Sequence, residues 1–382
     1  MFSTAKVKKN VKVPLLAGIF ALIAIAARPL PAATLAPLPP PTILTIASWG
    51  GAYEESQRKA YFEPFERANP SIKIKIVNAS GDQVARLREQ AAKKAIEWDL
   101  VDVAAADAIR LCKEKIAAPV DIDKLLQRAP DDTVPSSDFG QAVVSPCFIP
   151  EIVYSTTIGY RSDVLSVPPT GLCDIFDLHR FPGKRALEKR PINNLEWALV
   201  CDGVDPDKVY EVLDTPDGIE RALLRLDTLR GNVVWWTDGN EPAELLRSGA
   251  VVMASAYNGR LFDLVTKKNP KVKMLWDRQV FDFDGWIIPE GGKNRAAVET
   301  FLKFATSTDR LAAQASYIPY GPARRSSALL VGKHATLGID MQPFLPTAPD
   351  NAKTTLIYNY DWWATNRDAL DKRFADWLVK GP

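Results

Sequence analysis

The sequence predicts an α/β protein with a largely parallel sheet and two domains. Apolar, β-branched runs alternate with helix-compatible stretches after residue 42, a pattern typical of βαβ units. A cleavable leader would leave about 345 residues, more than one hydrophobic core usually holds. A long β-branched and aromatic run over 152–160 then leads into a second set of elements, as expected of a strand that crosses between domains.

The first 33 residues have the order of a secretory signal peptide. Four lysines precede an apolar run over 13–27, and small residues follow as far as Ala33, near which we expect cleavage. The run is short for a membrane span, and an uncleaved anchor is the alternative. Residues 34–41 are a proline-rich leader, expected to be stiff and extended. The mature chain is therefore expected to be free in an exported, oxidising compartment.

Charge gives no support to nucleic acid as a partner. The whole chain is formally +2, with 48 basic and 46 acidic residues. Five of the basic residues and no acids lie in residues 1–36, so the mature chain carries about −3. A weak negative balance offers no electrostatic footprint for a polyanion.

Before the crossing strand, we expect three strands alternating with three helices. The segment 71–77 alternates lysine with isoleucine, as in a strand with one solvated side. The expected strands lie at 43–47, 71–77 and 98–104, and the expected helices at 54–65, 83–94 and 108–115.

After the crossing strand, the pattern restarts at residue 193. The segment 177–191 is basic and rich in turn residues, and we expect it to be solvated surface. Expected helices lie at 193–202, 206–212, 216–228, 242–248 and 294–306, with a terminal helix within 356–378; expected strands lie at 233–236, 250–257, 272–276 and 285–288.

The stretch 43–53 ends a strand in a large ring and two glycines. Trp49, Gly50 and Gly51 follow the strand directly and precede a helix. Ligands of open α/β sheets bind at the carboxyl ends of strands, so we interpret these three residues as one wall of a binding site. The alternative is an ordinary βα turn with Trp49 in the core.

Other strand ends carry aromatic and acidic residues together. Trp236 and Tyr257 each end a strand. Asp282 and Asp284 are separated by one residue, so both side chains point to the same side of an extended segment. Two like charges on one side are unfavourable in a core and suit a site for a cation. Alternatively, Trp235 fills the core, Tyr257 only caps its strand, and one acid caps a helix or bonds to the hinge backbone.

An enzyme is not indicated. The sequence lacks a glycine-rich phosphate loop, a GxSxG elbow and an HExxH helix. His179 and His334, with no closely spaced cysteines, offer neither a convincing general base nor a metal site. No cofactor is implied. A secreted hydrolase with a carboxylate pair remains the alternative from another functional class.

Several segments, in their order along the chain, together resemble a known family. They are the signal peptide, ILTIASWGG, WDLVDV, IVYSTTIGYRSDVL, FPGKRAL, WWTDGNEPAELLRSGAVVMASAYNGR, DFDGWIIPEGG and YIPYGP. This series is similar to the periplasmic solute-binding proteins of ABC importers, in the branch of the spermidine/putrescine receptors.

The resemblance implies a two-lobed fold of the second periplasmic-binding-protein type, with two strand crossovers as a hinge. Lobe one would comprise 42–152 and 286–330, and lobe two 153–285 and the carboxyl-terminal 331–382. It also implies a small ligand in the cleft between the lobes, an inner-membrane ABC permease as partner, and a monomer.

The resemblance also implies site residues, and this chain departs from the family at some of them. Polyamine receptors tend to have aromatic residues at positions 107 and 282, and a small residue at Arg260. Extra acids suit a polyamine-like cation, whereas an inward Arg260 would favour a carboxylate-bearing or zwitterionic ligand. The alternative for Arg260 is an outward salt bridge. Another small solute, amino-acid-derived or thiamine-like, stays open. The expected ligand-binding residues are Trp49, Gly50, Gly51, Asp107, Trp236, Tyr257, Asp282, Asp284 and Tyr320.

Four cysteines in an exported chain favour two disulfides, with three possible connectivities. We favour Cys112 with Cys147 and Cys173 with Cys201, because each bridge then stays within one stretch of chain. The resemblance implies the first pair, and the second is an addition in this chain.

Overall fold

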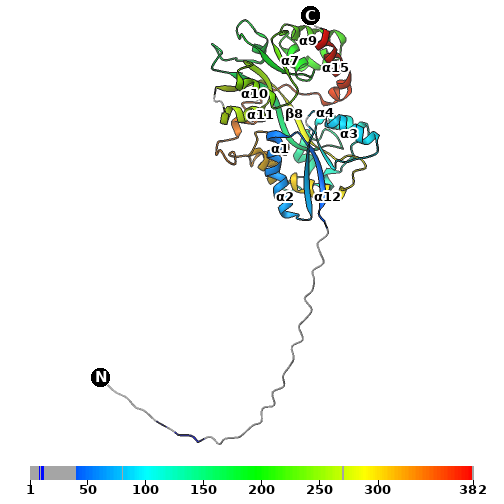
Figure 1. Cartoon of the computed structure of the whole chain (residues 1–382), viewed down its shortest axis with the longest axis vertical. Helices are drawn as coiled ribbons and strands as arrows, with labels where there is room; N and C mark the ends of the chain where they lie inside the picture. Colours follow the sequence, from blue (N-terminus) through cyan, green and yellow to red (C-terminus); the bar gives the residue numbers. More distant parts are fainter. Residues whose placement is uncertain (1–7, 9, 13–39, 80, 269–270, 381–382) are drawn as a thin grey trace, which may run out of the picture. The chain divides into compact units, whose positions relative to one another are not determined.

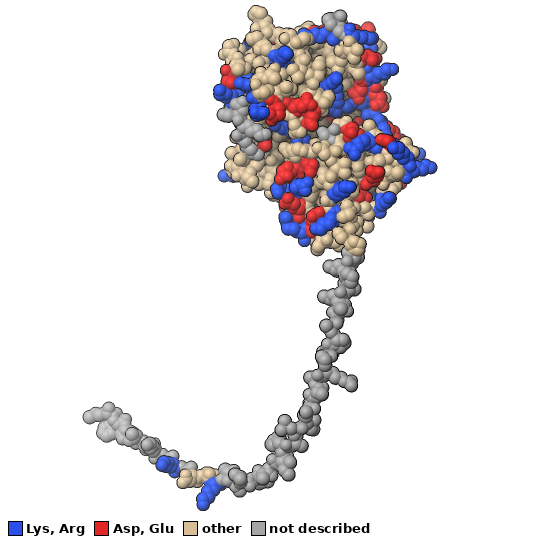
Figure 2. All heavy atoms as spheres, viewed as in Figure 1, with Lys and Arg blue, Asp and Glu red and all other residues tan. Residues whose placement is uncertain are grey.

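The structure, a computed structural model, describes residues 8, 10–12, 40–79, 81–268 and 271–380. Residues 41–382 form one compact unit, separate from residues 1–40. The expected signal peptide and most of the proline-rich leader lie outside the described residues. Among the residues described, no helix combines the length and the apolar character needed to cross a bilayer. Figure 2 shows basic and acidic side chains interspersed over the drawn face of the compact unit.

The described part of the chain forms one nine-stranded sheet in the order β2-β1-β3-β8-β4-β7-β5-β6, and β9 pairs with β4 (Figure 1). The ladders β1–β2, β1–β3, β5–β6 and β5–β7 are parallel, and every ladder made by β4 or β8 is antiparallel. The strands are β1 (Thr42–Ser48), β2 (Ile72–Asn78), β3 (Leu100–Ala104), β4 (Ile149–Arg161), β5 (Arg185–Glu188), β6 (Val233–Trp236), β7 (Met253–Tyr257), β8 (Val272–Ile287) and β9 (Gly321–Pro322).

Two long antiparallel strands, β4 and β8, join the two parallel parts of the sheet. The sequence predicted two short strands at 272–276 and 285–288, whereas β8 is one strand of 16 residues. Its middle is irregular, with a register shift opposite Thr156 and Ile158 and a positive φ of 53° at Arg278. This polar, irregular middle concealed the continuity of the strand.

Helices cover the sheet and enclose separate apolar clusters. One cluster packs around α7, α9 and α15 and contains Trp197, Trp363 and Phe374, so the expected terminal helix is confirmed. Another packs around α2, α12 and α13 and contains Phe65 and Phe301. The helices are α1 (Gly51–Gln57), η1 (Arg58–Phe62), α2 (Glu63–Ala68), α3 (Gln83–Ala92), α4 (Ala105–Lys113), α5 (Ile122–Leu125), α6 (Pro135–Phe139), η2 (Gly140–Ala142), η3 (Leu172–Phe176), α7 (Asn194–Val200), η4 (Pro206–Lys208), α8 (Val209–Leu213), α9 (Pro216–Asp227), α10 (Glu241–Ser248), α11 (Asn258–Asp263), η5 (Leu264–Lys268), α12 (Arg295–Ala305), α13 (Thr308–Ala315), α14 (Arg325–Ala328), η6 (Gln342–Phe344) and α15 (Tyr360–Lys380).

The expectation that 177–191 is solvated surface was wrong for its second half. Residues 185–188 form β5, which is buried and lies between β7 and β6. The Arg185 side chain is fully buried, and it donates hydrogen bonds of 2.7–3.1 Å to the carbonyls of Ile175, Gly183 and Asp177. Because these carbonyls satisfy the guanidinium, a basic residue can occupy an internal strand.

Both expected disulfides are present. Cys112 is bonded to Cys147 and Cys173 to Cys201, with Cα–Cα distances of 5.7 Å and 5.2 Å. The first ties α4 to the segment before β4, and the second ties η3 to the end of α7.

Candidate functional site

The central cavity of the compact unit has the β4–β8 ribbon as its floor. Alternate residues of each strand line it, because directly paired residues of an antiparallel ladder point to the same face. Asp282 is paired with Tyr154, and Asp284 with Ile152. The predicted common direction of Asp282 and Asp284 is therefore confirmed. The floor residues are Ile152, Tyr154, Thr156, Val280, Asp282 and Asp284.

The walls come from loops at the ends of other strands and from the carboxyl-terminal segment. The cavity has a volume of about 90 Å³. The wall residues are Trp49, Tyr53, Ala104, Ala106, Asp107, Arg190, Ile192, Asn193, Gly239, Tyr257, Arg260, Tyr320, Tyr358 and Arg367.

Six of the nine residues predicted for the site line this cavity: Trp49, Asp107, Tyr257, Asp282, Asp284 and Tyr320. The other three do not. Trp236 is fully buried behind Tyr257, with ring centroids 5.5 Å apart, and donates to the Ser255 hydroxyl. It is a core residue that supports the wall from behind.

Gly50 and Gly51 lie beside the cavity and shape its edge. Both have positive φ, 67° and 59°. The Gly50 carbonyl accepts a hydrogen bond of 3.1 Å from Arg260 Nη2. A Cβ at Gly51 would lie 2.5 Å from Arg260 Nη1 and 3.0 Å from Asn240 Oδ1. The two glycines therefore let the β1–α1 turn approach α11 closely.

Asp284 is held at the bottom of the cavity by two donors from the β1–α1 region. Trp49 Nε1 donates to its Oδ2 over 2.9 Å, and the Tyr53 hydroxyl lies 3.0 Å from its Oδ1. Burial, and then the negative charges of Asp102 and Glu151, raise the pKa of Asp284 well above its usual range. Within the described chain, no Lys or Arg makes an ion pair with it.

Asp282 lies next to Asp284 on the floor. Its Oδ2 accepts a hydrogen bond of 2.9 Å from the Tyr154 hydroxyl, and its Oδ1 accepts one from the Phe283 amide. Burial raises the pKa of Asp282 to about 7. Both floor carboxyls therefore hold protons more tightly than an exposed aspartate does.

Aromatic rings surround these acids. Tyr154 packs edge-on against Tyr257 and Tyr320, with ring centroids 5.5 Å and 6.2 Å apart, and Tyr53 lies 6.1 Å from Tyr320. Ring faces and carboxylates together bind organic cations well.

Arg260 points inward, so the outward salt bridge considered for it is absent. The residue is 8 % exposed and lines the cavity. Among the described residues, its Nη2 donates to the Gly50 carbonyl, and its Nε and Nη1 are buried and find no hydrogen-bond partner there. Buried charged donors without partners are costly, and an anion is the group that would satisfy them.

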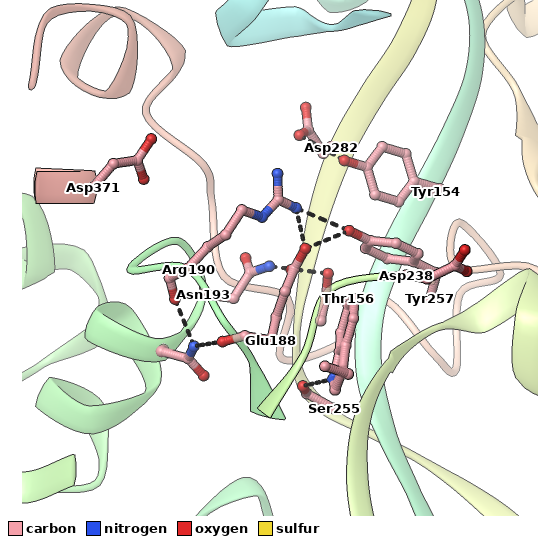
Figure 3. Close-up of polar contacts among 12 residues, drawn as sticks. Tyr154, Thr156, Glu188, Arg190, Asn193, Asp238, Ser255, Tyr257, Asp282 and Asp371 are labelled. Atoms are coloured by element: carbon pink, nitrogen blue, oxygen red, sulfur yellow. Dashed lines mark hydrogen bonds and ion pairs between the residues drawn. The ribbon is translucent and has the colours of Figure 1, made fainter. Parts of the chain in front are cut away.

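A polar network on the cavity wall, around Arg190 and Tyr257, was missed by the sequence reasoning (Figure 3). Arg190 makes an ion pair with Glu188 and donates to the Tyr257 hydroxyl over 2.9 Å, and that hydroxyl donates to Glu188 over 2.8 Å. Nearby, Asn193 donates to Thr156. A run of charges in a turn-rich segment gave no sign of this inward network.

Arg367 and Asp107 complete the cavity wall from two helices. Arg367 of α15 is paired with Asp371 at 2.8 Å, and Asp107 of α4 is paired with Arg110 at 3.0 Å. Asp107, which we expected to bind ligand, therefore already has a cationic partner. The spacing of Arg367 from the apolar residues of α15 could have suggested that its side chain points toward the protein interior. Nothing in the sequence, however, links α15 to the cavity.

Below Asp284 lies a group of three buried carboxyls, Asp102, Glu151 and Asp284. Their oxygens lie within 4.8 Å of one another. The neutral amides of Gln57 and Gln314 and the Tyr53 hydroxyl contact them. Neutral donors fill the space around the oxygens, so this arrangement does not call for a metal ion.

Comparison with known proteins identifies the family. The model of the bacterial extracellular solute-binding proteins matches residues 60–339. A gamma-aminobutyric acid-binding protein of Pseudomonas aeruginosa is 31 % identical over 337 residues, which is 88 % of this chain and 91 % of that protein. This chain is a bacterial extracellular solute-binding protein.

Solved structures of other solute-binding proteins share the fold. The periplasmic binding protein MotA from A. tumefaciens B6, in complex with glucopine, has a TM-score of 0.78 at 25 % identity and covers 88 % of this chain and 100 % of its own. The Atu4243 GABA receptor has a TM-score of 0.75 at 26 % identity, with coverages of 89 % and 98 %. PotD of Streptococcus pneumoniae, a spermidine/putrescine-binding protein, shares the fold at 16 % identity, with a TM-score of 0.66 and coverages of 88 % and 99 %.

The solute-binding assignment also settles the functional class. The family and these relatives are solute-binding proteins and not enzymes, so the alternative of a secreted hydrolase is set aside. The two-lobed α/β fold expected from the sequence is confirmed.

Proposed function

We propose that this solute-binding protein captures a small zwitterion, with an ammonium group at one end and a carboxylate at the other, and delivers it to an inner-membrane ABC permease. It would do so in the periplasm as a monomer, after removal of its signal peptide. The single observation that carries the proposal is the buried Arg260 edge with Nε and Nη1 unpaired.

The cavity offers opposite charges to the two ends of such a ligand. Asp284 and Asp282 on the floor provide an acidic pole. Arg260 provides a basic pole beside the β1–α1 turn. A pure cation would leave the Arg260 donors unsatisfied and would bring a like charge to them, which is unfavourable in a buried site.

The relatives agree with a zwitterion. One is a gamma-aminobutyric acid-binding protein, and another is a GABA receptor. The third binds glucopine. The polyamine ligand expected from the sequence becomes the second candidate, favoured by the acids and rings of the floor.

Binding would involve closure of two lobes. The proposed lobes are 42–152 with 286–330, and 153–285 with 331–382, and the β4–β8 ribbon would be the hinge. Trp49 and Tyr53 would then close from lobe one onto Tyr257 and Arg260 of lobe two. The hydrogen bond from Arg260 to Gly50 would belong to the closed form.

Calorimetric titration of the exported, purified protein with 4-aminobutyrate, putrescine and spermidine tests the proposal. We expect a dissociation constant in the micromolar range or tighter for 4-aminobutyrate, or about −8 kcal/mol. Tight binding of putrescine with no heat from 4-aminobutyrate would support the polyamine reading and overturn the zwitterion.

Arg260→Gln is the decisive variant. We expect it to weaken 4-aminobutyrate binding about 30-fold or more, because a charged, buried hydrogen-bonded pair is lost. Arg247→Gln is the matched control, since Arg247 is an exposed arginine on α10 that makes an ion pair with Glu244 and does not line the cavity. Equal affinity of wild type and Arg260→Gln would contradict the proposed role.

A further inference from the structure

The contacts of the Tyr53 hydroxyl show that the three buried carboxyls, Asp102, Glu151 and Asp284, have more acceptor oxygens than their neighbours have hydrogens to donate. The Tyr53 hydroxyl lies 2.7 Å from Glu151 Oε2 and 3.0 Å from Asp284 Oδ1. A hydroxyl has one hydrogen and can donate to only one of them. The other contact is favourable only if that carboxyl is itself protonated and donates to the Tyr53 oxygen.

Gln57 shows the same shortage. Its Nε2 lies 3.0–3.2 Å from both oxygens of Asp102 and both oxygens of Glu151. Two amide hydrogens face four oxygens. Gln314 Nε2 adds one bond of 2.7 Å to Glu151 Oε1. Neutral side chains therefore cannot balance three ionised carboxyls here.

Burial and charge lead to the same conclusion. Asp102 and Glu151 are 0 % exposed and Asp284 is 3 % exposed. Across the described chain, none of the three makes an ion pair or a hydrogen bond with Lys or Arg. Three negative charges within 4.8 Å of one another, out of water, would repel strongly.

We propose that Asp102, Glu151 and Asp284 form a proton-holding cluster beneath the ligand site, and that the ligand's ammonium group displaces a proton from it. This inference rests on the proposed function. In the free protein the cluster shares at least one proton. When the ammonium group binds beside Asp284, the carboxyl O–H bond of the cluster breaks, Asp284 ionises and the proton passes to the buffer.

Within the described chain, no basic side chain pairs with Asp284. The ammonium group of the ligand is therefore the group that would compensate its negative charge. Arg260 of the cavity wall donates to the Gly50 carbonyl and lies near Tyr320. Burial raises the pKa of Asp102 to about 8 and that of Glu151 well above its usual range. The titratable groups facing the cluster are Tyr53 from α1, Tyr61 from η1, Tyr154 from β4, Asp282 from β8 and Tyr320 before β9.

Calorimetry in buffers of different ionisation enthalpy measures the displaced protons. We expect the observed binding enthalpies of 4-aminobutyrate at pH 7 to differ between phosphate and Tris. The difference should correspond to the release of about half to one proton per bound ligand. The affinity is then expected to rise by up to tenfold per pH unit between pH 6 and pH 8. Zero proton release and a flat affinity over this range would overturn the proposal.

Glu151→Gln isolates the cluster from the ligand contacts. Glu151 does not line the cavity, and glutamine keeps its shape and its acceptor oxygen. Removing this like charge lowers the pKa of Asp284, so we expect at most half of the wild-type proton release and a flatter dependence of affinity on pH. The matched control is Glu196→Gln, because Glu196 is also a buried carboxyl with a raised pKa, but its partners are Tyr210 and Trp363. Equal effects of the two variants would contradict the cluster.

A carboxyl carbon NMR titration of the free protein separates this inference from the proposed function. If 4-aminobutyrate does not bind, the zwitterion proposal fails, and the titration still tests the cluster. We expect at least one of the three carboxyls, assigned with Glu151→Gln and Asp102→Asn, to remain protonated at pH 7. Ordinary pKa values for all three would overturn the cluster even if the ligand binds.

Discussion

The indole of Trp49 donates a hydrogen bond of 2.9 Å to Asp284, a residue 235 positions later in the chain. The bond connects the β1–α1 turn to the floor of the cavity. It holds the indole ring of Trp49, which was predicted to line the site, against the carboxylate of Asp284. Asp284 was predicted to bind an amine. The donor, and not only the ring, is thus part of the site.

Trp49→Phe removes this donor and keeps an aromatic ring. Without the indole N–H, the ionised form of Asp284 is less stabilised, so we expect about a tenfold weaker affinity for 4-aminobutyrate at pH 7. Calorimetry measures the change. Trp235→Phe is the control, because Trp235 packs on α15 and lies outside the cavity. The role of the donor is refuted if both variants bind like wild type.

Gly51→Ala tests the close approach of the β1–α1 turn to α11. The positive φ of 59° costs a residue with a Cβ about 1 kcal/mol, and the Cβ would press on Arg260. We expect weaker ligand binding together with a small loss of stability. Gly338→Ala, at a positive φ of 67° with open space around it, shows the backbone effect alone. If both glycine variants bind the ligand equally well, the close approach of the β1–α1 turn to α11 does not contribute to binding.

The free protein should lose stability as pH rises from about 5 to 8. The pKa of Asp282 is raised to about 7 and that of Asp102 to about 8, so the folded state binds more protons than the unfolded state in this range. Each such carboxyl lowers the free energy of unfolding by up to about 1.4 kcal/mol per pH unit until its folded pKa is passed. Urea unfolding at several pH values measures this. Stability that rises steadily from pH 5 to pH 8 would contradict the raised pKa values.

The second disulfide should stabilise the protein without shaping the site. Replacing Cys173 and Cys201 by serine removes a bridge across 28 positions, which in the chain-entropy model contributes about 3 to 4 kcal/mol. We expect a lower urea midpoint and an unchanged affinity at 25 °C, because neither residue lines the cavity. A large loss of affinity in the folded variant would count against this separation.

The sequence predicted the elements whose side chains alternate or repeat regularly. The Lys-Ile alternation of β2 and the apolar runs of β1 and β3 are visible without a structure. The DFD spacing correctly placed Asp282 and Asp284 on one face. These features depend on local geometry, which sequence spacing reports directly.

Features that depend on distant partners were not predictable. β5 is hidden by Arg185 and Glu188, whose charges are satisfied by carbonyls and by residues of other loops. Trp236 ends its strand as a ligand-binding ring would, yet it is buried behind Tyr257. Glu151 and Asp102 lie in strands that look entirely structural, and only the sheet order brings them to Asp284.

The long β4–β8 ribbon has a consequence for the time course of capture. The floor acids lie on the proposed hinge. In the proposed closure they would stay in place while the walls move, and Arg260 would meet Gly50 only in the closed form. The ammonium end should therefore bind first and the carboxylate end last. Loss of Arg260 would then leave the association rate nearly unchanged and shorten the residence time of the ligand, which is the interval that the permease has to receive it.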